Sequence, residues 1–513
     1  MYTFFIETVG CQMNRLDSEL AATGLIRAGL GQAVEKTAAD VIIFNTCSIR
    51  QHAEDKIYSA IGRLKQWKLR KPFGVIGVIG CMAQRDQDKI IKRAPHVDLV
   101  LGPGQLDLLA ETVYRLLEGK SGGEQIAPEV LVSLQRVKAK HLAVIESFRL
   151  FDPERNVETR SNRFQAMVRV MFGCDKFCAY CIVPKVRGPE QSRSPVEILN
   201  EVRQLADQGV QEITFIGQTV NSYKYIIAQK NPDIPKPAWA IGFAREQPLR
   251  DATLACSASG ILKQLEYTDD QLPQNITCNI SAGVVRLSDL LYMSSEVSGL
   301  RRIKFVTNYP TGMSDELLAA VRDLPKVSKY LHIPVQSGSD NVLKRMKRQY
   351  TVSEYCELIG KIHQMIPSAA VTSDFIVGFC GETDAEFEET AELVRYCRFK
   401  NSFVFKYSER PDTKSAELYQ DDVPEIIKKQ RNNDLLAIQD KISLELNKQF
   451  IGKKTEILVE EISKNYDNGK FQLSGRTNCD RIVVFDSDNS DLIGQFIEVE
   501  IRDTTPFTLF GFQ

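Results

Sequence analysis

The sequence lacks an excess of charge of either sign. Its 513 residues carry 65 Lys and Arg against 66 Asp and Glu, so the formal net charge is −1 at pH 7. A strongly basic chain is attracted to nucleic acid as a whole, and this composition excludes such a general attraction. Any binding of nucleic acid must therefore come from a local basic surface.

The sequence also lacks long apolar runs. None approaches the roughly 20 residues of a membrane-spanning helix, so no membrane partner is expected. The opening Met-Tyr-Thr-Phe-Phe shows no basic segment followed by an apolar one, as a secretory signal would. The 12 cysteines therefore do not indicate a secreted disulfide framework. We expect a reducing cytoplasmic location, which suits oxygen-sensitive metal clusters.

The length of the chain exceeds what one hydrophobic core supports, so two or three domains are expected. The patterns divide it into a first α/β domain (1–119), a linker (120–159), a second α/β domain (160–446) and a small β domain (447–513). The linker is indicated by Gly122-Gly123 and by a polar stretch before the second domain.

The first domain alternates strand-like and helix-like patterns. Strands are predicted over residues 2–9, 41–45 and 73–79, and helical patterns follow from about Asn14, Gln51 and Gln84. A βαβ order of this kind predicts an open parallel sheet.

The most informative stretch is residues 173–181, where Cys174, Cys178 and Cys181 are spaced Cys-x3-Cys-x2-Cys. Three thiolates on one short loop can each take one iron of a 4Fe-4S cube and leave the fourth iron open for a small molecule. A zinc site is the alternative, but tetrahedral zinc needs a fourth ligand, and about thirty following residues contain neither Cys nor His. The spacing favours the cluster.

With Tyr180 directly before the last cysteine, this motif resembles the signature of the radical S-adenosylmethionine enzymes. The resemblance implies that the open iron binds the methionine part of S-adenosylmethionine, whose reductive cleavage gives a 5′-deoxyadenosyl radical. It makes Cys174, Cys178 and Cys181 the catalytic, cofactor-binding and metal-binding residues.

Each of the first three predicted strands ends at a cysteine, namely Cys11, Cys47 and Cys81. The carboxyl ends of parallel strands meet at one edge of a sheet, so the three thiols can converge although they are far apart in sequence. A single free cysteine is often just a small buried residue, but the shared position of all three favours a second metal site.

The sequence motifs around these cysteines resemble those of the radical S-adenosylmethionine methylthiotransferases, and most closely those of their MiaB type. The motifs are Gly-Cys-Gln-Met-Asn, Asn-Thr-Cys-Ser-Ile-Arg and Gly-Cys-Met-Ala. The resemblance implies two 4Fe-4S clusters, the second on Cys11, Cys47 and Cys81 to hold or supply sulfur. It implies methylthiolation of N6-isopentenyladenosine beside the tRNA anticodon. Sister branches act on threonylcarbamoyl-adenosine or a ribosomal protein side chain, and a non-catalytic cluster protein that binds RNA is a further alternative.

Strand-then-helix units continue through the second domain. Strands are predicted over residues 212–216, 302–305, 330–333, 371–377 and 402–405, which indicates a partial (β/α) barrel with its site at the strand carboxyl ends. By resemblance, five residues there line the cofactor pocket: Glu190, Arg193, Gln336, Ser337 and Asp374. The alternative for each is a polar turn residue that caps a helix.

Two features depart from the family pattern. Cys380 stands where relatives usually have proline, and we interpret it as a tolerated turn substitution. About sixty residues, roughly 225–283, replace a short connection and contain several prolines. This insertion predicts a long loop peripheral to the chemistry.

The last part of the sequence predicts a helix followed by a small β domain. Residues after Pro424 have helical spacing. Short strands are then predicted over residues 455–459, 471–474, 482–485 and 495–501, as in a small antiparallel barrel. It resembles the RNA-binding TRAM domain, with candidate phosphate contacts at Lys453, Lys454, Lys470, Arg476 and Arg481, although surface lysines are usually only solvated.

The expected partners follow from the resemblance. They are tRNA, an electron-donor protein and a sulfur source, neither of the last two identified, for an enzyme expected to be a monomer.

Overall fold

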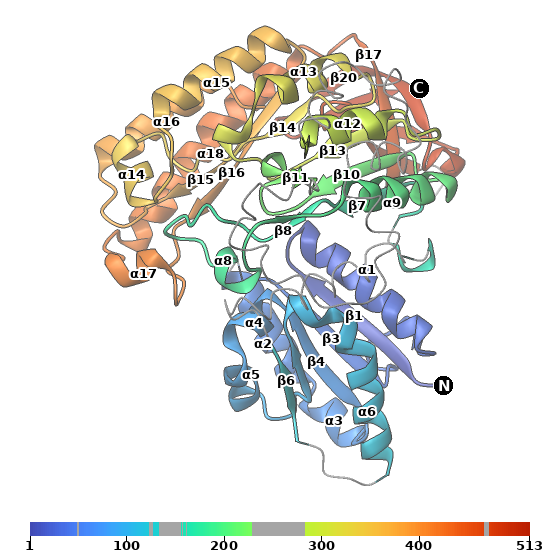
Figure 1. Cartoon of the computed structure of the whole chain (residues 1–513). Coiled ribbons are helices and arrows are strands. Elements are labelled where there is room, and N and C mark those ends of the chain that lie inside the picture. The colour runs from blue at the N-terminus through green and yellow to red at the C-terminus, as the bar shows by residue number, and fades with distance from the viewer. Residues whose placement is uncertain are drawn as a thin grey trace, which may run out of the picture.

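The structure is a computed structural model that describes residues 1–48, 51–122, 127–132, 155, 157–160, 162–227, 283–465 and 471–512. The described residues form an N-terminal α/β sheet, an arc of six strands with outer helices, and a C-terminal barrel (Figure 1). Among the described helices, none combines the length and the apolar character that crossing a membrane requires.

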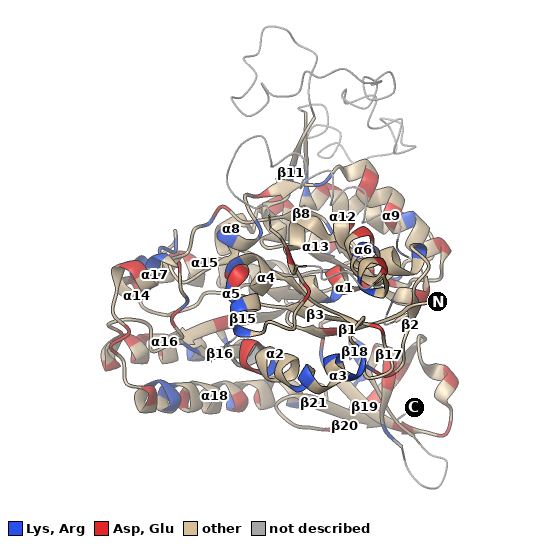
Figure 2. Cartoon of the chain, turned by 90° about the horizontal axis from the view of Figure 1, so that it is seen from below, with Lys and Arg blue, Asp and Glu red and all other residues tan. Residues whose placement is uncertain are grey.

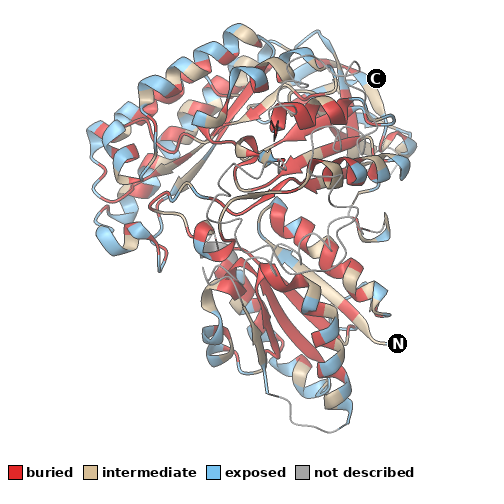
Figure 3. Cartoon of the chain, in the orientation of Figure 1, coloured by how far each residue is buried: buried red, intermediate tan, exposed pale blue. Residues whose placement is uncertain are grey.

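The N-terminal sheet has six parallel strands in the order β2-β1-β3-β4-β5-β6. The strands are β1 (Thr3–Val9), β2 (Gly31–Gln32), β3 (Val41–Thr46), β4 (Val75–Gly80), β5 (Leu99–Leu101) and β6 (Glu129–Leu131). The central strands β3 and β4 are buried along their whole length (Figure 3) because helices cover both faces of the sheet. The predicted open parallel sheet is confirmed.

Two separate cores hold these helices to the sheet. Helices α1 (Gln12–Arg27) and α6 (Leu109–Ser121) pack on one face. The other face is covered by α2 (Gln51–Arg63), α3 (Lys65–Arg70), α4 (Cys81–Asp86) and α5 (Asp88–Arg93). Strand β6 pairs with β5 although it lies inside the predicted linker 120–159, so this part of the linker belongs to the sheet. The domain limits themselves stay predictions.

The second part contains the predicted strand-then-helix units. Its strands are β7 (Gln165–Arg169), β10 (Glu212–Ile216), β13 (Arg302–Phe305), β14 (Tyr330–His332), β15 (Ala370–Val377) and β16 (Asn401–Lys406). They pair in parallel as β13-β10-β7 and β14-β15-β16, and a parallel bridge from Ile303 to Val327 connects the two groups. Figure 1 shows the six strands side by side as an arc, which confirms the partial (β/α) barrel.

Helices cover the outside of the arc. They are α9 (Pro195–Asp207), α12 (Leu287–Ser295), α13 (Asp315–Asp323), α15 (Val352–Met365), α16 (Asp384–Cys397) and α18 (Glu425–Lys448). Buried apolar residues from the strands and these helices form one continuous core. Both signs of charge alternate along α18, as expected for a helix with a solvated face (Figure 2).

Residues 228–282 of the predicted insertion lie outside the described residues. Its two ends are described: β11 (Lys224–Ile226) and β12 (Val284–Arg286) form an antiparallel pair. The Ile227 N–H also donates to the Gly283 carbonyl at 2.8 Å. The insertion therefore leaves and re-enters the arc at one point.

The C-terminal part is a closed barrel in the order β17-β18-β19-β21-β20. Its strands are β17 (Lys454–Asn465), β18 (Phe471–Thr477), β19 (Ile482–Ser487), β20 (Phe496–Thr504) and β21 (Thr508–Phe512). Two details of the prediction were wrong. The fifth strand, β21, was missed because its short run follows a Pro-containing turn, and β21 pairs with β19 in parallel, so the barrel is not purely antiparallel.

This barrel docks on the amino ends of the arc strands. Asp480, in the turn between β18 and β19, pairs with Lys304 at 3.0 Å and with Arg476 at 3.1 Å. Arg302, at the start of β13, donates to the Arg476 carbonyl at 3.0 Å. The barrel therefore contacts the edge of the arc opposite the strand carboxyl ends, where the cysteine motifs lie.

Candidate cluster sites

The loop 173–181, here called the cysteine loop, leaves the arc just after β7. The short strand β8 (Met171–Phe172) pairs with β9 (Gln191–Ser192), which brings residues 188–190 against the start of the loop. Gly173 has φ +65°, and a Cβ there would lie 2.0 Å from the Pro189 carbonyl oxygen. Only glycine fits this turn, so the glycine before Cys174 has a steric cause.

The three thiols of the cysteine loop influence one another. Cys174 and Cys178 are buried and Cys181 is partly buried. Burial raises the pKa of the Cys174 thiol, and the neighbouring Cys178 raises it further. Burial, together with Cys178, raises the pKa of Cys181 to about 12. Thiolates are disfavoured in this pocket unless a positive centre compensates them, so the donor set fits an iron-sulfur group.

Arg348 also belongs to this site, although no sequence motif indicates it. Its Nη1 donates to Cys178 Sγ at 3.4 Å, and its Nη2 donates to the Pro334 carbonyl at 2.7 Å. The guanidinium also lies over the rings of Tyr309 and Tyr350, at 4.5 and 5.0 Å from their centroids. Arg348 is far from the cysteine motif in sequence, so only folding reveals its contact with Cys178.

Cys11, Cys47 and Cys81, here called the strand-end cysteines, follow β1, β3 and β4. Gly10 and Gly80 allow these strand ends to approach closely. A Cβ at Gly10 would lie 2.9 Å from the Cβ of Cys47, and one at Gly80 would lie 2.6 Å from the Thr46 carbonyl oxygen. The repeated Gly-Cys motif therefore reflects crowding of backbone and side chains at one edge of the sheet.

The strand-end thiols also lie near one another. Cys11 is the N-cap of α1, and its thiol donates to Asn14 Oδ1 at 3.1 Å. A hydrogen bond from the Cys47 side chain lowers the pKa of Cys11 to about 6, against the effect of burial and with help from Arg187 and from the backbone N–H groups of Met13 and Asn14. Burial raises the pKa of Cys81, and Cys11 adds to this rise. The structure thus brings the three predicted thiols together.

The described residues contain no group of three or more His, Cys, Asp or Glu side chains that could hold a metal ion. The cluster sites proposed below therefore rest on the placement of the thiols and on their motifs, and not on a preformed site for a single ion.

The strand-end cysteines face the second part of the chain. Cys81 packs against Ile182 and Val186, which follow the cysteine loop, and Cys11 packs near Ile216 at the end of β10. In Figure 1, α8 (Val183–Val186) lies between the N-terminal sheet and the arc, beside α4. The two cysteine sets therefore lie on either side of one interface.

Buried charges hold this interface. Asp17 on α1 accepts from Arg169 Nη1 at 3.0 Å and from Arg187 Nη2 at 2.7 Å. Glu54 on α2 accepts from Arg85 at 2.8 Å and from Arg410 of the second part at 3.3 Å. Breaking such buried pairs from one side is costly, which favours a fixed relation between the two cysteine sets.

The five residues predicted for the cofactor pocket fall into two groups. Three face the carboxyl side of the arc strands: Glu190, before β9, accepts from Thr219 Oγ1 after β10 at 3.1 Å, Asp374, within β15, lies 3.4 Å from His332 Nε2 at the end of β14, and Gln336, after β14, has φ +77°. The other two make internal contacts. Arg193 forms a buried pair with Glu201 at 2.8 Å, and buried Ser337 faces Thr390. Their geometry favours the turn-and-packing interpretation.

Two further polar atoms at these strand ends point to a ligand. Gln218 Oε1, after β10, and Asn308 Oδ1, after β13, are shielded from water and accept no hydrogen bond from the described residues. A buried acceptor without a donor costs free energy, and the amino groups of a bound cofactor would satisfy both. The residues present therefore fit S-adenosylmethionine.

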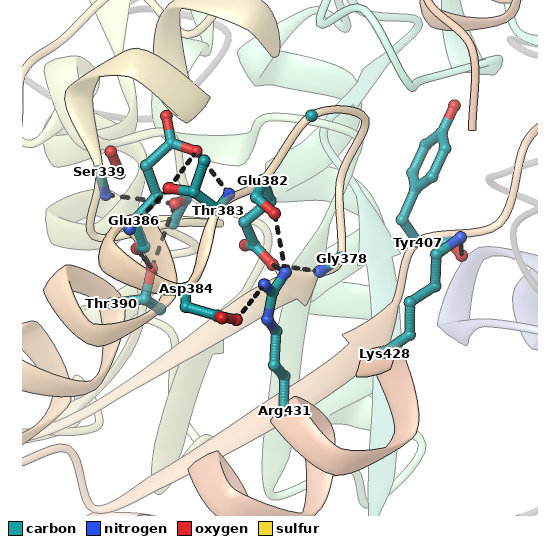
Figure 4. Close-up of polar contacts among 12 residues, drawn as sticks. Ser339, Gly378, Glu382, Thr383, Asp384, Glu386, Thr390, Tyr407, Lys428 and Arg431 are labelled. Carbon is teal, nitrogen blue, oxygen red and sulfur yellow. Dashed lines mark hydrogen bonds and ion pairs between the residues drawn. The ribbon is translucent and has the colours of Figure 1, made fainter. Parts of the chain in front are cut away.

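Cys380 lies in a turn that is held in place by hydrogen bonds from Arg431 of α18. Glu382 accepts from the Gly378 N–H at 2.6 Å and from Arg431 Nη1 at 2.7 Å (Figure 4). The Cys380 thiol is buried in an apolar cluster with Phe379 and Tyr407. This placement agrees with a substitution within the turn.

The predicted phosphate contacts differ in exposure. Lys453 and Lys454 are exposed at the start of β17. Arg476 pairs with Glu460 and Asp480, while Arg481 is buried, donates to Asn447 Oδ1 at 3.0 Å and lies 4.5 Å from the ring centroid of Phe450. Arg481 is therefore not accessible as a phosphate contact, because its guanidinium is enclosed between the barrel and α18. Lys470 lies outside the described residues.

Family models match three regions of the chain. Residues 3–102 match the Uncharacterized protein family UPF0004, residues 168–269 and 277–394 match the Radical SAM superfamily, and residues 448–512 match the TRAM domain. Membership of the Radical SAM superfamily implies a 4Fe-4S cluster and S-adenosylmethionine. Among solved structures, the radical S-adenosylmethionine methyltransferase TsrM from Kitasatospora setae aligns with a TM-score of 0.49 and 12% identity, over 91% of this chain and 79% of TsrM.

Two relatives that match over nearly their full length carry the same name. The tRNA-2-methylthio-N(6)-dimethylallyladenosine synthase of Rhodopirellula baltica is 46% identical over 99% of this chain and 95% of the relative. The synthase of the same name from Syntrophotalea carbinolica is 37% identical over 98% of this chain and 97% of the relative. Identity at this level over the full length is decisive: the chain belongs to the family of the tRNA-2-methylthio-N(6)-dimethylallyladenosine synthases.

Proposed function

We propose that this protein is a tRNA methylthiotransferase that converts N6-isopentenyladenosine beside the anticodon into its 2-methylthio derivative in the cytoplasm. The observation that carries the proposal is the placement of two cysteine sets across one interface, with Cys81 packed on Ile182, the residue after Cys181. Family membership supports the substrate, because the relatives are named for this product.

In this proposal, Cys174, Cys178 and Cys181 hold one 4Fe-4S cluster and Cys11, Cys47 and Cys81 hold a second, which holds or supplies sulfur. Bound together, the first cluster and S-adenosylmethionine supply the one-electron chemistry needed to attack an aromatic C–H bond that has no useful acidity. Glu190, Gln336 and Asp374, with Gln218 and Asn308, would hold the cofactor at the strand carboxyl ends.

The chain's own residues prepare the site in two ways. Arg348 donates to Cys178 and stacks on two tyrosines, so it fixes one ligand and adds positive charge beside it. The buried pairs of Asp17 and Glu54 seal the interface between the cysteine sets, which keeps water from a reactive centre.

The TRAM domain supports tRNA as the substrate class. The electron donor, the sulfur source and the monomeric state stay predictions.

The test is mass spectrometry of tRNA nucleosides from cells with and without this chain. The 2-methylthio derivative of N6-isopentenyladenosine should disappear with the chain, and the unmodified precursor should accumulate. An assay of the reconstituted enzyme on the three substrates of the methylthiotransferase branches would show whether a sister activity is present instead. Turnover of threonylcarbamoyl-adenosine or a ribosomal protein alone would overturn the proposal.

A further inference from the structure

Arg187 links the cysteine loop to the strand-end cysteines. It follows α8 directly, and α8 begins two residues after Cys181. Its side chain is only 5% exposed because it crosses the interface and enters the N-terminal part. Arg187, a residue of the second part of the chain, is therefore surrounded by residues of the N-terminal part.

Its contacts in the N-terminal part are specific. Nε donates to Cys81 Sγ at 3.3 Å, and Nη2 donates to Asp17 Oδ2 at 2.7 Å. Nη1 is shielded from water and has no acceptor among the described residues. A guanidinium cannot lose its charge in a protein, so a buried N–H without an acceptor is unfavourable unless a bound group supplies one.

The charge balance around Asp17 points the same way. Asp17 accepts from both Arg169 and Arg187, so one carboxylate faces two guanidinium groups. All three side chains are at most 5% exposed. Because Asp17 is shared, it compensates the charge of Arg187 only in part, and Arg187 lies directly beside Cys81 in a region with little water, which favours an anionic group at that place.

We propose that Arg187 is a positioning residue of the strand-end cluster, donating hydrogen bonds to Cys81 and to a sulfur of the cluster that the strand-end cysteines hold. The inference rests on the proposed function, which places a cluster there. Donors and positive charge near cluster sulfur favour the reduced state. The strand-end site is therefore complete only when the second part of the chain is docked on it.

The test isolates the strand-end cluster in the full-length chain. Cys174, Cys178 and Cys181 are all replaced by Ala, and this parent is reconstituted with iron and sulfide without oxygen. A redox titration with dithionite, which delivers one electron to the cluster, is followed by electron paramagnetic resonance. Iron content and circular dichroism check loading and fold in each variant.

Arg187→Gln in this parent removes both the charge and the donor to Cys81. The ratio of reduced to oxidised cluster at a fixed potential should fall about tenfold, which equals about 59 mV for a one-electron couple. Arg187→Lys keeps a charge for Asp17 and should shift the ratio in the same direction by less. Arg169→Gln removes the other arginine on Asp17 but no donor to Cys81, so it should change the ratio by much less than Arg187→Gln.

The outcomes separate two failures. If the parent holds no cluster, the proposed function fails together with this inference. If the parent holds one, but Arg187→Gln and Arg187→Lys both titrate like the parent, only the inference fails. A shift in Arg169→Gln as large as that in Arg187→Gln would also overturn it, because the effect would then belong to Asp17. If Arg187→Gln does not fold, Arg187→Lys alone decides between a shift and none.

Discussion

The two cysteine sets are built in opposite ways. The cysteine loop places three thiols on one short stretch after β7, while the strand-end cysteines are collected from three separate strands by the parallel sheet. Their electrostatics also differ. Cys11 caps α1 and its pKa is lowered to about 6 by Cys47, whereas burial raises the pKa of Cys181 to about 12. One set depends on local sequence and the other on topology.

The largest expected effect comes from destroying one set and keeping the other. Cys178→Ala should abolish reductive cleavage of S-adenosylmethionine and remove about half of the bound iron, because a lost thiolate is a lost iron ligand. Cys47→Ala should keep that cleavage and lose only the methylthio product. The measurements are 5′-deoxyadenosine and iron content. Undiminished 5′-deoxyadenosine from Cys178→Ala would refute the assignment of the cysteine loop.

The contrast in thiol pKa can be measured in iron-free protein. The thiolate is the nucleophile, so alkylation of Cys11 should rise as the pH passes about 6 and then level off, while Cys181 stays slow until strongly alkaline pH. Peptide mass spectrometry after brief labelling reads both sites. Cys47→Ala removes the hydrogen bond that lowers the Cys11 pKa, so its midpoint should move upward; an unmoved midpoint would contradict this cause.

Buried charges also hold the C-terminal barrel against the arc, at the contact between Asp480 and Lys304. Asp480→Asn leaves buried Lys304 without its nearest carboxylate in the barrel and should lower the free energy of unfolding by about 2–3 kcal/mol. Chemical denaturation measures the change. Asp491→Asn, on an exposed turn of the same barrel, is the control and should change it by less than about 0.5 kcal/mol. Equal effects of both would show that the Asp480 interface contributes nothing.

A smaller effect is expected for tRNA binding. Truncation before Lys453 would expose Arg302 and Lys304, which the barrel covers, so point variants test the surface better. Lys453→Gln with Lys454→Gln should weaken binding and lower the slope of log affinity against log salt by about two units or less. Cleavage of S-adenosylmethionine without tRNA should continue at its original rate. Lys361→Gln on α15 is the matched control, and an equal loss there would remove the barrel as the RNA contact.

The smallest effect is expected from the insertion. A two-residue Asn-Gly turn can replace residues 228–282, because β11 and β12 are already paired and Ile227 meets Gly283. Methylthiolation should stay near that of the intact chain. Lost activity in a deletion variant that remains folded and loaded with iron would show that the insertion takes part in the reaction.

The secondary structure of the arc was predictable because strand patterns are local. The predicted strands 212–216 and 302–305 agree with β10 and β13 residue for residue. The short strands β6 and β21 escaped prediction because three to five residues carry little periodicity, and pairing with a neighbour decides whether they form.

The sequence by itself determined the spacing of the cysteine loop, the position of a cysteine after each of three strands, and the alternation that gives both α/β sheets. Tertiary structure alone decided which arginines donate hydrogen bonds to the thiols. Arg187 and Arg348 reach Cys81 and Cys178, while Arg481 turns into the contact between the barrel and α18. The reason is physical: a motif depends on neighbours along the chain, but the partner of a buried charge depends on which surfaces meet when distant elements pack.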